Sequence, residues 1–379
     1  MRRFSYFLFL LFIGILWMCP SADAAWTTKR LTWNSGRSIY PEIALGPSGH
    51  IHVVWYDNTH SNDEIYFKRS TDGGLSWSSA KRLSWSADRS YYPTVAVDSG
   101  GNIYVVWQDY SLGDTAEVLY KKSTDGGASW ISKRLTWNPE NSCNAVVRVD
   151  TSGNIHVFWD DSSPGNGEIF HKKSTDGGAS WTTKRITWNS GNSGNPDVLI
   201  DTGGNIHVAW YDNTPGNSEI YYKKSADGGA TWASTKRLSW NSESSAHPRI
   251  AEDGSGYIHV VWQDFTPGNA EIFHSVSTDS GMTWAAKRLT WSSEASTYPA
   301  IAADISGSIH VFWAEGSVNT EIYSLTSTDG GATWGSAKRL TWNSGASSSP
   351  EIAIDSSGHF HVVWHDASGG NFDIYYKQK

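Results

Sequence analysis

The sequence predicts an all-β fold: a seven-bladed β-propeller of four-stranded blades, in which the N-terminal strand completes the last blade. Three observations predict it. The motif Lys-Arg-Leu/Ile-Thr/Ser-Trp recurs seven times at intervals of 51 or 52 residues, and no linker interrupts the repeats. Helical periodicity is absent after residue 24. The last repeat stops at Lys379 without its final tryptophan, and Trp26 supplies the missing one, which a ring explains and an open array does not.

The 22 tryptophans occupy three positions in each repeat, with Trp17 left over near the N-terminus. One set closes the recurring motif: Trp33, Trp85, Trp137, Trp188, Trp240, Trp291 and Trp342. A second set lies in an apolar run before an acidic residue: Trp55, Trp107, Trp159, Trp210, Trp262, Trp313 and Trp364. The third set ends a Ser-x-Asp-x-Gly-x-Ser/Thr-Trp segment: Trp77, Trp130, Trp181, Trp232, Trp284 and Trp334, with Trp26 as the seventh. We expect Trp26 and Trp33 to be buried where the ring closes.

Each repeat predicts four short strands in a fixed order. In the first repeat, residues 39–45 form an apolar strand with a proline near its start, and residues 46–50 have the composition of a hairpin turn. Residues 51–56, 64–70 and 77–85 follow as the second, third and fourth strands. Four such strands per repeat describe a propeller blade. The predicted blades within one domain, residues 25–379, are about 38–86, 90–138, 142–189, 193–241, 245–292, 296–343, and 347–379 plus 25–34.

The N-terminus predicts secretion to an extracellular or periplasmic location. Residues 1–24 combine a charged start, an apolar stretch and a small-x-small cleavage site, which is typical of a signal peptide. Lipid anchoring at Cys19 is not expected, because the residues before it are bulkier than that processing accepts. After cleavage Cys143 is the only cysteine, so disulfides do not stabilise the fold. A formal net charge of −8 argues against nucleic acid as the partner; no membrane span follows the signal, and a monomer is expected.

The third tryptophan set carries a family resemblance. The segment from Ser70 to Trp77 resembles the Asp-box, the bacterial neuraminidase repeat of sialidases and related propellers, and it recurs five more times over nearly the whole mature chain. The resemblance implies a turn between the third and fourth strands, on the face opposite the active site of family enzymes. We therefore interpret its aspartates as structural: Asp72, Asp125, Asp176, Asp227, Asp279 and Asp329. The second glycine of each box, such as Gly74, is expected to have positive φ.

Other repeated polar residues also favour structural roles. An aspartate such as Asp57 follows the second strand and is expected to cap its own loop, while Glu64 begins the third strand and is expected to pair with Lys81. A catalytic pair is needed once, whereas this pair of acids recurs in all seven repeats. The histidines at the position of His52 are expected to be buried and hydrogen-bonded. No metal-ligand spacing appears within a repeat, and no cofactor is expected.

Departures from the repeat point to a site, because a single site must break sevenfold symmetry. On the face opposite the Asp-boxes, the first two blades present arginine and tyrosine, which suit a sugar or a carboxylate-bearing ligand through ring stacking and bidentate hydrogen bonding. The candidate ligand-binding residues are Arg37, Tyr40, Tyr56, Arg89, Tyr92, Arg148, Tyr211, Arg249 and Tyr298. Drift between duplicated blades is the alternative explanation of these differences.

The catalytic machinery of sialidases does not carry over to this sequence. Family enzymes use three arginines, a tyrosine nucleophile and acidic groups, but an expected Arg-Ile-Pro motif is replaced here by Tyr40-Pro41-Glu42-Ile43. No catalytic residue is assigned, and whether the chain is an enzyme stays open. The sequence favours a secreted scaffold for recognising a glycan or glycoconjugate. The alternatives are a glycoside hydrolase resembling exo-sialidases or a polysaccharide lyase, with its site opposite the Asp-boxes, and an extracellular protein-interaction domain.

Overall fold

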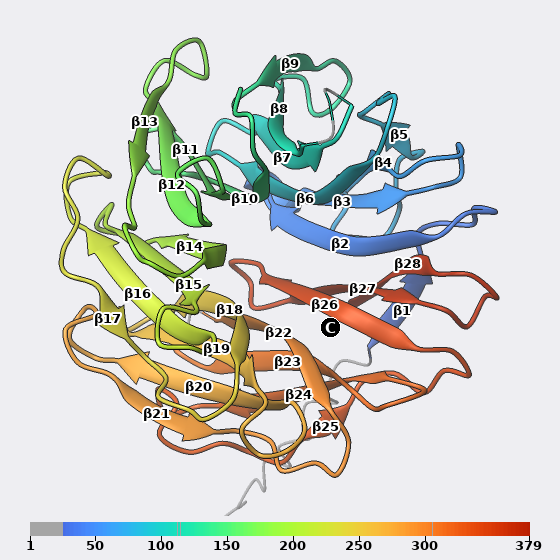
Figure 1. Cartoon of the computed structure of the whole chain (residues 1–379). Helices are drawn as coiled ribbons and strands as arrows, with labels where there is room; N and C mark the ends of the chain where they lie inside the picture. Colours follow the sequence, from blue (N-terminus) through green and yellow to red (C-terminus); the bar gives the residue numbers. More distant parts are fainter. Residues whose placement is uncertain (1–25, 112, 114, 305) are drawn as a thin grey trace, which may run out of the picture.

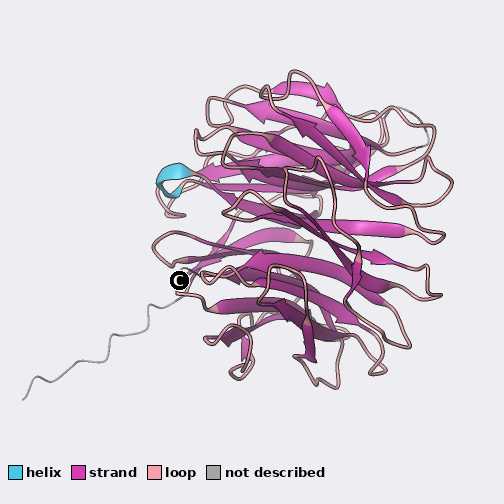
Figure 2. Cartoon of the chain, turned by 90° about the vertical axis from the view of Figure 1, so that its left-hand side faces the viewer, coloured by secondary structure: helices cyan, strands magenta, loops and turns pink. Residues whose placement is uncertain are grey.

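The fold is a closed ring of seven antiparallel four-stranded sheets, seen in Figure 1 with the first strand of each blade nearest the centre. The computed structural model describes residues 26–111, 113, 115–304 and 306–379, and the predicted signal peptide and Cys19 lie outside them. Figure 2 shows a molecule built of strands and loops, and one short 3-10 helix, η1 (Pro47–Gly49), occurs in the described chain. The all-β prediction is confirmed.

The seven blades repeat the same strand order. Blade 1 contains β2 (Ser38–Leu45), β3 (Ile51–Asp57), β4 (Glu64–Ser70) and β5 (Lys81–Arg82). Blade 2 contains β6 (Ser90–Val97), β7 (Ile103–Asp109), β8 (Glu117–Ser123) and β9 (Ile131–Arg134). Blade 3 contains β10 (Ser142–Val149), β11 (Ile155–Asp161), β12 (Glu168–Ser174) and β13 (Thr182–Arg185). Blade 4 contains β14 (Ser193–Ile200), β15 (Ile206–Asp212), β16 (Glu219–Ser225) and β17 (Lys236–Arg237).

The remaining blades follow the same pattern until the chain closes. Blade 5 contains β18 (Ser245–Glu252), β19 (Ile258–Asp264), β20 (Glu271–Ser277) and β21 (Ala285–Arg288). Blade 6 contains β22 (Ser296–Ala303), β23 (Ile309–Glu315), β24 (Glu321–Ser327) and β25 (Lys338–Arg339). Blade 7 contains β26 (Ser347–Ile354), β27 (Phe360–Asp366), β28 (Asp373–Gln378) and, from the other end of the chain, β1 (Thr27–Arg30).

The N-terminal strand closes the ring as the sequence predicts. β1 pairs antiparallel with β28, from Thr27 opposite Gln378 to Arg30 opposite Tyr375. The side chain of Thr32 donates a hydrogen bond of 2.8 Å to the buried Asp373 carboxylate. This pairing leaves no open seam, because β1 covers the edge of β28 and gives blade 7 the same four strands as the other blades.

The fourth strands are shorter than predicted. Residues 77–85 contain only the two-residue strand Lys81–Arg82, and no blade has a fourth strand longer than four residues. The first half of the predicted range contains Trp77, which ends the Asp-box, and three residues outside any strand, so β5 begins only where the Lys-Arg dipeptide lies opposite Tyr66 and Phe67.

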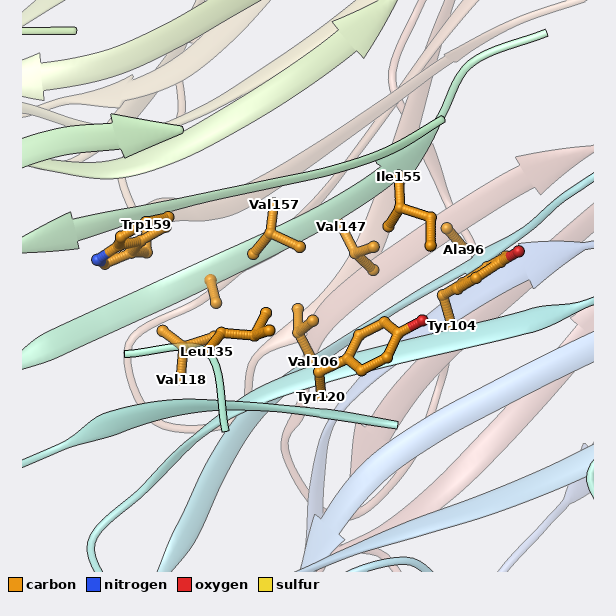
Figure 3. Close-up of a cluster of buried hydrophobic side chains, with 11 residues drawn as sticks. Ala96, Tyr104, Val106, Val118, Tyr120, Leu135, Val147, Ile155, Val157 and Trp159 are labelled. Atoms are coloured by element: carbon orange, nitrogen blue, oxygen red, sulfur yellow. The ribbon is translucent and has the colours of Figure 1, made fainter. Parts of the chain in front are cut away.

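Hydrophobic cores lie between neighbouring blades. Figure 3 shows the cluster between blades 2 and 3, with Trp159 at one end and Tyr104 and Tyr120 at the other. Each blade contributes one second-strand tryptophan to these layers, and all seven are at most 2% exposed. Burial of large aromatic side chains on both sides of every blade stabilises the ring.

The expected burial of Trp33 is wrong. Trp33 is 66% exposed, whereas Trp26 is partly buried against Phe360. All seven tryptophans of the Lys-Arg-Leu/Ile-Thr/Ser-Trp motif are between 66% and 72% exposed. Each of these tryptophans follows the end of the outermost strand. In blade 7, Leu31 fills the space between the blades, and Trp33, the next side chain on the same side of the strand, reaches the surface.

In the described part of the chain, no helix has the length and apolar composition that crossing a membrane requires.

Candidate functional site

The strand register gives the propeller two chemically different ends. Ser38 lies opposite Asp57, and Asp57 lies opposite Glu64, so these three residues share one end of blade 1. Leu45, Ile51 and Ser70 are paired at the other end, where the Asp-box follows directly. The loops between blades and the loops from second to third strands therefore lie opposite the Asp-boxes.

Each Asp-box is a turn closed by its own side chains. Asp72 accepts hydrogen bonds from the Ser76 backbone N–H at 2.8 Å and from Ser70 Oγ at 2.7 Å. The Ser76 hydroxyl also donates to this carboxylate, and this hydrogen bond is the largest of the causes that lower the pKa of Asp72 to about 2. Gly74 has φ of +87°, and a Cβ there would lie 2.2 Å from the Tyr376 hydroxyl of blade 7. The positive φ is as predicted, and the close contact gives glycine a second reason to occur.

The recurring Lys-Arg dipeptide joins the blade to two different partners. Lys81 donates to the Gly127 carbonyl of the next Asp-box at 3.1 Å, whereas Arg82 pairs with Glu64 of its own blade at 2.6 Å. The predicted pairing of Glu64 with Lys81 is therefore wrong. In the register, Arg82 lies opposite Tyr66, two residues from Glu64 and on the same face, while Lys81 faces the neighbouring blade.

The repeated histidines are buried as expected. His156, His207 and His259 are fully buried, and the Nε2 atom of each lies 3.0–3.3 Å from an aspartate in the turn between first and second strands. Blade 1 has Gly46 in place of that aspartate, and His52 Nδ1 has no hydrogen-bond partner among the described residues. Burial lowers the pKa of His52 to about 4.

The aspartates that follow the second strands organise their loops. Asp57 is fully buried and accepts hydrogen bonds from Ser38 Oγ at 2.5 Å, Asn34 Nδ2 at 2.6 Å and the Thr59 N–H at 2.8 Å. All of these partners lie at the end opposite the Asp-boxes. This confirms a loop-capping role for Asp57. None of these hydrogen bonds is directed into the central channel.

A bulge in every first strand directs one side chain toward the channel. The pairing register shifts between Ile39 and Glu42, and Tyr40 has φ of +50°. The same conformation, with φ between +47° and +52°, recurs at Tyr40, Tyr92, Asn144, Asn195, His247, Tyr298 and Ser349. Positive φ is uncommon for residues with side chains, and bulges often redirect a side chain next to a functional site.

Contacts between blades hold these bulges in place. The Asn144 N–H donates to Gln108 Oε1 at 3.1 Å, and the Tyr298 N–H donates to Gln263 Oε1 at 3.0 Å. The Asn195 N–H donates to Asp160 at 3.0 Å in the same way. In blades 2, 3 and 5, the residue after the buried second-strand tryptophan thus fixes the bulge of the next blade, which gives that variable position a structural role there.

Tyrosines gather at the bulge end of the channel, which we call the mouth. The Tyr40 ring lies edge-on to Tyr92 at 5.1 Å and to Tyr298 at 6.1 Å, and its hydroxyl lies 3.3 Å from that of Tyr298. Tyr56 stacks behind Tyr40 at 5.7 Å and is only 4% exposed. His247 packs against Tyr298 at 5.1 Å. Side chains from blades 1, 2, 5 and 6 therefore form one cluster.

The channel is a cavity of about 710 Å³ lined by the first strands of all seven blades. Beneath the mouth, Arg249 pairs with Glu351 at 2.6 Å and lies 3.9 Å from Glu42. Arg148 pairs with Asp197 at 3.0 Å. Burial raises the pKa of Glu42, and the nearby Glu351 carboxylate raises it further, although Arg249 opposes the shift.

The predicted arginines are all placed near carboxylates. Arg37 lies 3.2 Å from Asp63, and Arg89 lies 3.2 Å from Asp88 with its guanidinium over Tyr91. Arg148 and Arg249 are paired inside the channel as described above. None of the four is thus an unpaired cation positioned for a carboxylate ligand, and they do not form one clamp.

The other predicted residues divide between the mouth and its support. Tyr40, Tyr92, Tyr211 and Tyr298 line the cavity, and Tyr92 is the most open of the mouth tyrosines at 39% exposed. Tyr211 packs over Gly194, where a Cβ would lie 2.6 Å from the tyrosine hydroxyl. Sequence reasoning missed Glu42, although that position was visibly variable, with arginine in blade 5 and acids in blades 1, 4 and 7.

The exposed tryptophans form a second repeated feature, which we call the rim tryptophans: Trp33, Trp85, Trp137, Trp188, Trp240, Trp291 and Trp342. An arginine from the same motif lies 5.6–5.9 Å from each ring. Among the residues that the structure describes, no cluster of three or more histidine, cysteine or acidic side chains is arranged to hold a metal ion.

Comparison with known proteins agrees with this geometry. A family model described as "BNR repeat-containing family member" matches residues 19–187. A sialidase from Streptococcus pneumoniae has a similar structure at a TM-score of 0.54 and 14% identity, covering 92% of this chain and 70% of that chain. The chain is an Asp-box β-propeller.

Two further solved structures share the propeller fold. An ulvan lyase of polysaccharide lyase family PL25, bound to -[GlcA(1-4)Rha3S]-, has a TM-score of 0.65 and 13% identity, covering 92% of this chain and 95% of that one. An α-L-arabinofuranosidase from Fusarium graminearum has a TM-score of 0.57 and 12% identity, covering 76% and 92%. A search of curated protein sequences found no significant match to this chain. At these identities the similarity establishes the fold.

Proposed function

We propose that this Asp-box propeller is a secreted glycan-recognition scaffold that binds a sugar at the mouth of its central channel. The proposal is based on the aromatic rings and the unpartnered polar atoms that surround that mouth. Tyr40, Tyr92 and Tyr298 offer aromatic rings and hydroxyls. Asn195 Oδ1 of blade 4 and Ser349 Oγ of blade 7 are buried in the cavity wall without a hydrogen-bond partner among the described residues.

This arrangement suits a pyranose ring. Its apolar C–H face can pack against tyrosine, and its hydroxyls can satisfy the orphaned polar atoms of Asn195 and Ser349, which are costly when unpartnered. The solved propellers of similar fold include enzymes whose names refer to glycans, which supports a glycan ligand. Because the predicted arginines are already paired with acids, we expect hydroxyl recognition and ring stacking at the mouth, not a carboxylate clamp.

The blades themselves supply conservative variants for the test. Asparagine occupies the bulge position in blades 3 and 4 with the same positive φ, so Tyr92→Asn and Tyr298→Asn preserve the backbone conformation. On a glycan array, the parent should bind a defined set of oligosaccharides, and the double variant should lose at least about tenfold in affinity, since each stacked ring contributes on the order of 1 kcal/mol.

The matched control is Tyr257→Asn. Tyr257 lies beside Gly330 of the blade 6 Asp-box, at the other end of the propeller. This variant should bind like the parent. Equal binding by the parent and the mouth double variant, or binding of a protein ligand alone, would contradict the proposal.

A catalytic role is the second candidate, and Glu42 is the observation that favours it. A carboxyl group whose pKa is raised by burial in a cavity has the property required of a proton donor. The test measures whether the protein cleaves, by hydrolysis or by elimination, the polysaccharides that contain the glycans it binds on the array. If turnover occurs and Glu42→Gln removes it without weakening binding, the protein is an enzyme with Glu42 in its site. The scaffold proposal expects binding without turnover.

A further inference from the structure

Burial does not account for the seven rim tryptophans, since each is about two-thirds exposed. Elsewhere the surface of the repeat has diverged: the residues before the Lys-Arg dipeptide are Thr-Thr, Ser-Ala, Ile-Ser, Ala-Ala or Ser-Thr in different blades. The exposed tryptophan is nevertheless present in all seven blades. A large aromatic side chain kept at the surface is typical of a contact site.

The rim tryptophans lie at the seams between blades, and the next blade adds a second cation to most of them. Lys68 of blade 1 places its ammonium group 5.4 Å from the Trp33 ring, and equivalent lysines lie 5.4–5.9 Å from four other rim tryptophans. These lysines are Lys68, Lys121, Lys172, Lys223 and Lys377. Blades 5 and 6 have Ser275 and Leu325 at this position, beside Trp240 and Trp291.

The five seam lysines lack counter-charges. Whereas Arg82 and its equivalents pair with the buried acid of their own blade, none of the seam lysines forms an ion pair with a described carboxylate within 4.0 Å. Lys68 donates instead to the Leu31 carbonyl, and Lys223 donates to the Ile186 carbonyl at 2.8 Å. Burial lowers the pKa of all five. An ammonium group has three N–H donors, so donors remain for an incoming anion.

We propose that the five lysine-bearing seams are repeated binding sites for the acidic sugars of a polysaccharide, with the rim tryptophan stacking on the sugar ring and the seam lysine binding its carboxylate or sulfate group. The proposal rests on the proposed function for the class of ligand and adds a second location, at the outer edge of the ring. Several equivalent sites on one rigid ring allow a polymer to engage more than one at a time, which strengthens binding without new contacts.

The ring contains its own matched control. Trp137 and Trp188 are neighbouring rim tryptophans with seam lysines, whereas Trp240 and Trp291 are neighbouring rim tryptophans without them. All four are similarly exposed, so replacing either pair by leucine removes a comparable surface. Binding would be measured by affinity electrophoresis in gels containing polygalacturonate, dextran sulfate or neutral dextran, with thermal melts of each variant to confirm folding.

We expect Trp137→Leu/Trp188→Leu to weaken binding to an acidic polymer by roughly tenfold, because two of five avid sites are lost. Trp240→Leu/Trp291→Leu should weaken it by less than about threefold. Lys172→Met/Lys223→Met should reproduce the first loss and reduce its dependence on salt, since the methionine keeps an apolar side chain and removes the charge. Polygalacturonate and dextran sulfate together reveal whether carboxylate or sulfate is preferred.

Three outcomes would overturn the inference. No loss in either pair would show that the rim does not bind the polymers. If both double tryptophan variants lost the same affinity, for neutral dextran as much as for acidic polymers, the seam lysines would have no role in binding. Tighter lysine-dependent binding to a single-stranded oligonucleotide than to any polysaccharide would assign the seams to another class of ligand.

The mouth and the rim can fail independently. In the Tyr92→Asn/Tyr298→Asn background, which tests the mouth, the rim losses on long polymers should be unchanged. Conversely, the rim variants should retain parental binding to short oligosaccharides. Loss of rim effects in that background would mean that polymer binding occurs at the mouth alone, which also overturns the inference.

Discussion

The two ends of the propeller use the same repeat in opposite ways. At the Asp-box end, each of the six boxes closes with the same serine–aspartate hydrogen bonds and packs its second glycine against an aromatic or histidine side chain of the preceding blade. At the mouth, seven bulges share one backbone conformation but carry tyrosine, asparagine, histidine or serine. At these two ends, the regular sequence of the Asp-box turns belongs to the scaffold, whereas a regular backbone with irregular side chains marks the candidate site at the mouth.

Both ends depend on a closed ring, and we expect the deletion of residues 25–34, which opens the ring, to lower the stability of the protein more than any other change that we propose. This deletion unpairs β28, removes Leu31, which is 2% exposed, and takes both Arg30 and Thr32 from the buried Asp373 carboxylate. Truncating one buried leucine alone costs about 2–5 kcal/mol, comparable with a large part of a domain's stability. Thermal unfolding measures the loss.

Two point variants within the same strand sharpen this prediction. Leu31→Ala should lower the melting temperature strongly, whereas Trp33→Leu should lower it little because that side chain is 66% exposed. If the deletion variant melts within a few degrees of the parent, the closure by β1 does not stabilise the ring.

Acid should weaken the molecule through its buried histidines, an effect of intermediate size. Burial lowers the pKa of His52 to about 4 and those of His171 and His274 well below 6.5. A histidine whose pKa is lower in the folded than in the unfolded state contributes its full stability above pH 6.5. That contribution is lost as pH falls from 6.5 toward the folded pKa, at about 1.4 kcal/mol per pH unit and histidine.

The control is His171→Tyr/His274→Tyr, because tyrosine occupies this position as Tyr222 in blade 4 and Tyr376 in blade 7. Urea unfolding at pH 7 and pH 5 should show a smaller acid loss in the variant than in the parent. Identical pH dependence would mean that these two histidines are not buried in their neutral form.

Variants of the Asp-box aspartates should have the smallest effects, and the effects should be alike. Asp72→Asn and Asp176→Asn each weaken the acceptor that organises an exposed turn. We expect small, similar decreases in melting temperature and unchanged glycan binding. A large difference between the two, or a loss of binding in one, would show that the Asp-box end is not the uniform half of the molecule.

The sequence was sufficient to predict the fold because the information is repeated seven times. Trp26 fixed the closure, and the hairpin turns fixed the strand order. The mouth was predicted in part: Tyr40, Tyr92 and Tyr298 do converge, since equivalent first-strand positions surround one channel. What the sequence did not reveal is the bulge in each first strand, which turns one side chain toward that channel and lies beside a proline in six of the seven blades.

Other features depended on contacts between blades and were not predictable from one repeat. The pairing of Arg249 with Glu351 joins blades 5 and 7, and the seam lysines reach a tryptophan of the preceding blade. Trp33 was expected to be buried where the ring closes, but its position at the end of the outermost strand leaves it exposed. Glu64 pairs with Arg82 and not with Lys81 because of the strand register between β4 and β5, which cannot be deduced from residue composition alone.

A crystal structure with the tightest-binding short oligosaccharide tests most directly whether the irregular end is the site. We predict a sugar ring at the mouth, packed against Tyr92 and Tyr298 and hydrogen-bonded to Asn195 Oδ1 or Ser349 Oγ. A ligand seated on the Asp-box turns, with the mouth tyrosines making no contact to it, would show that the mouth is not the binding site.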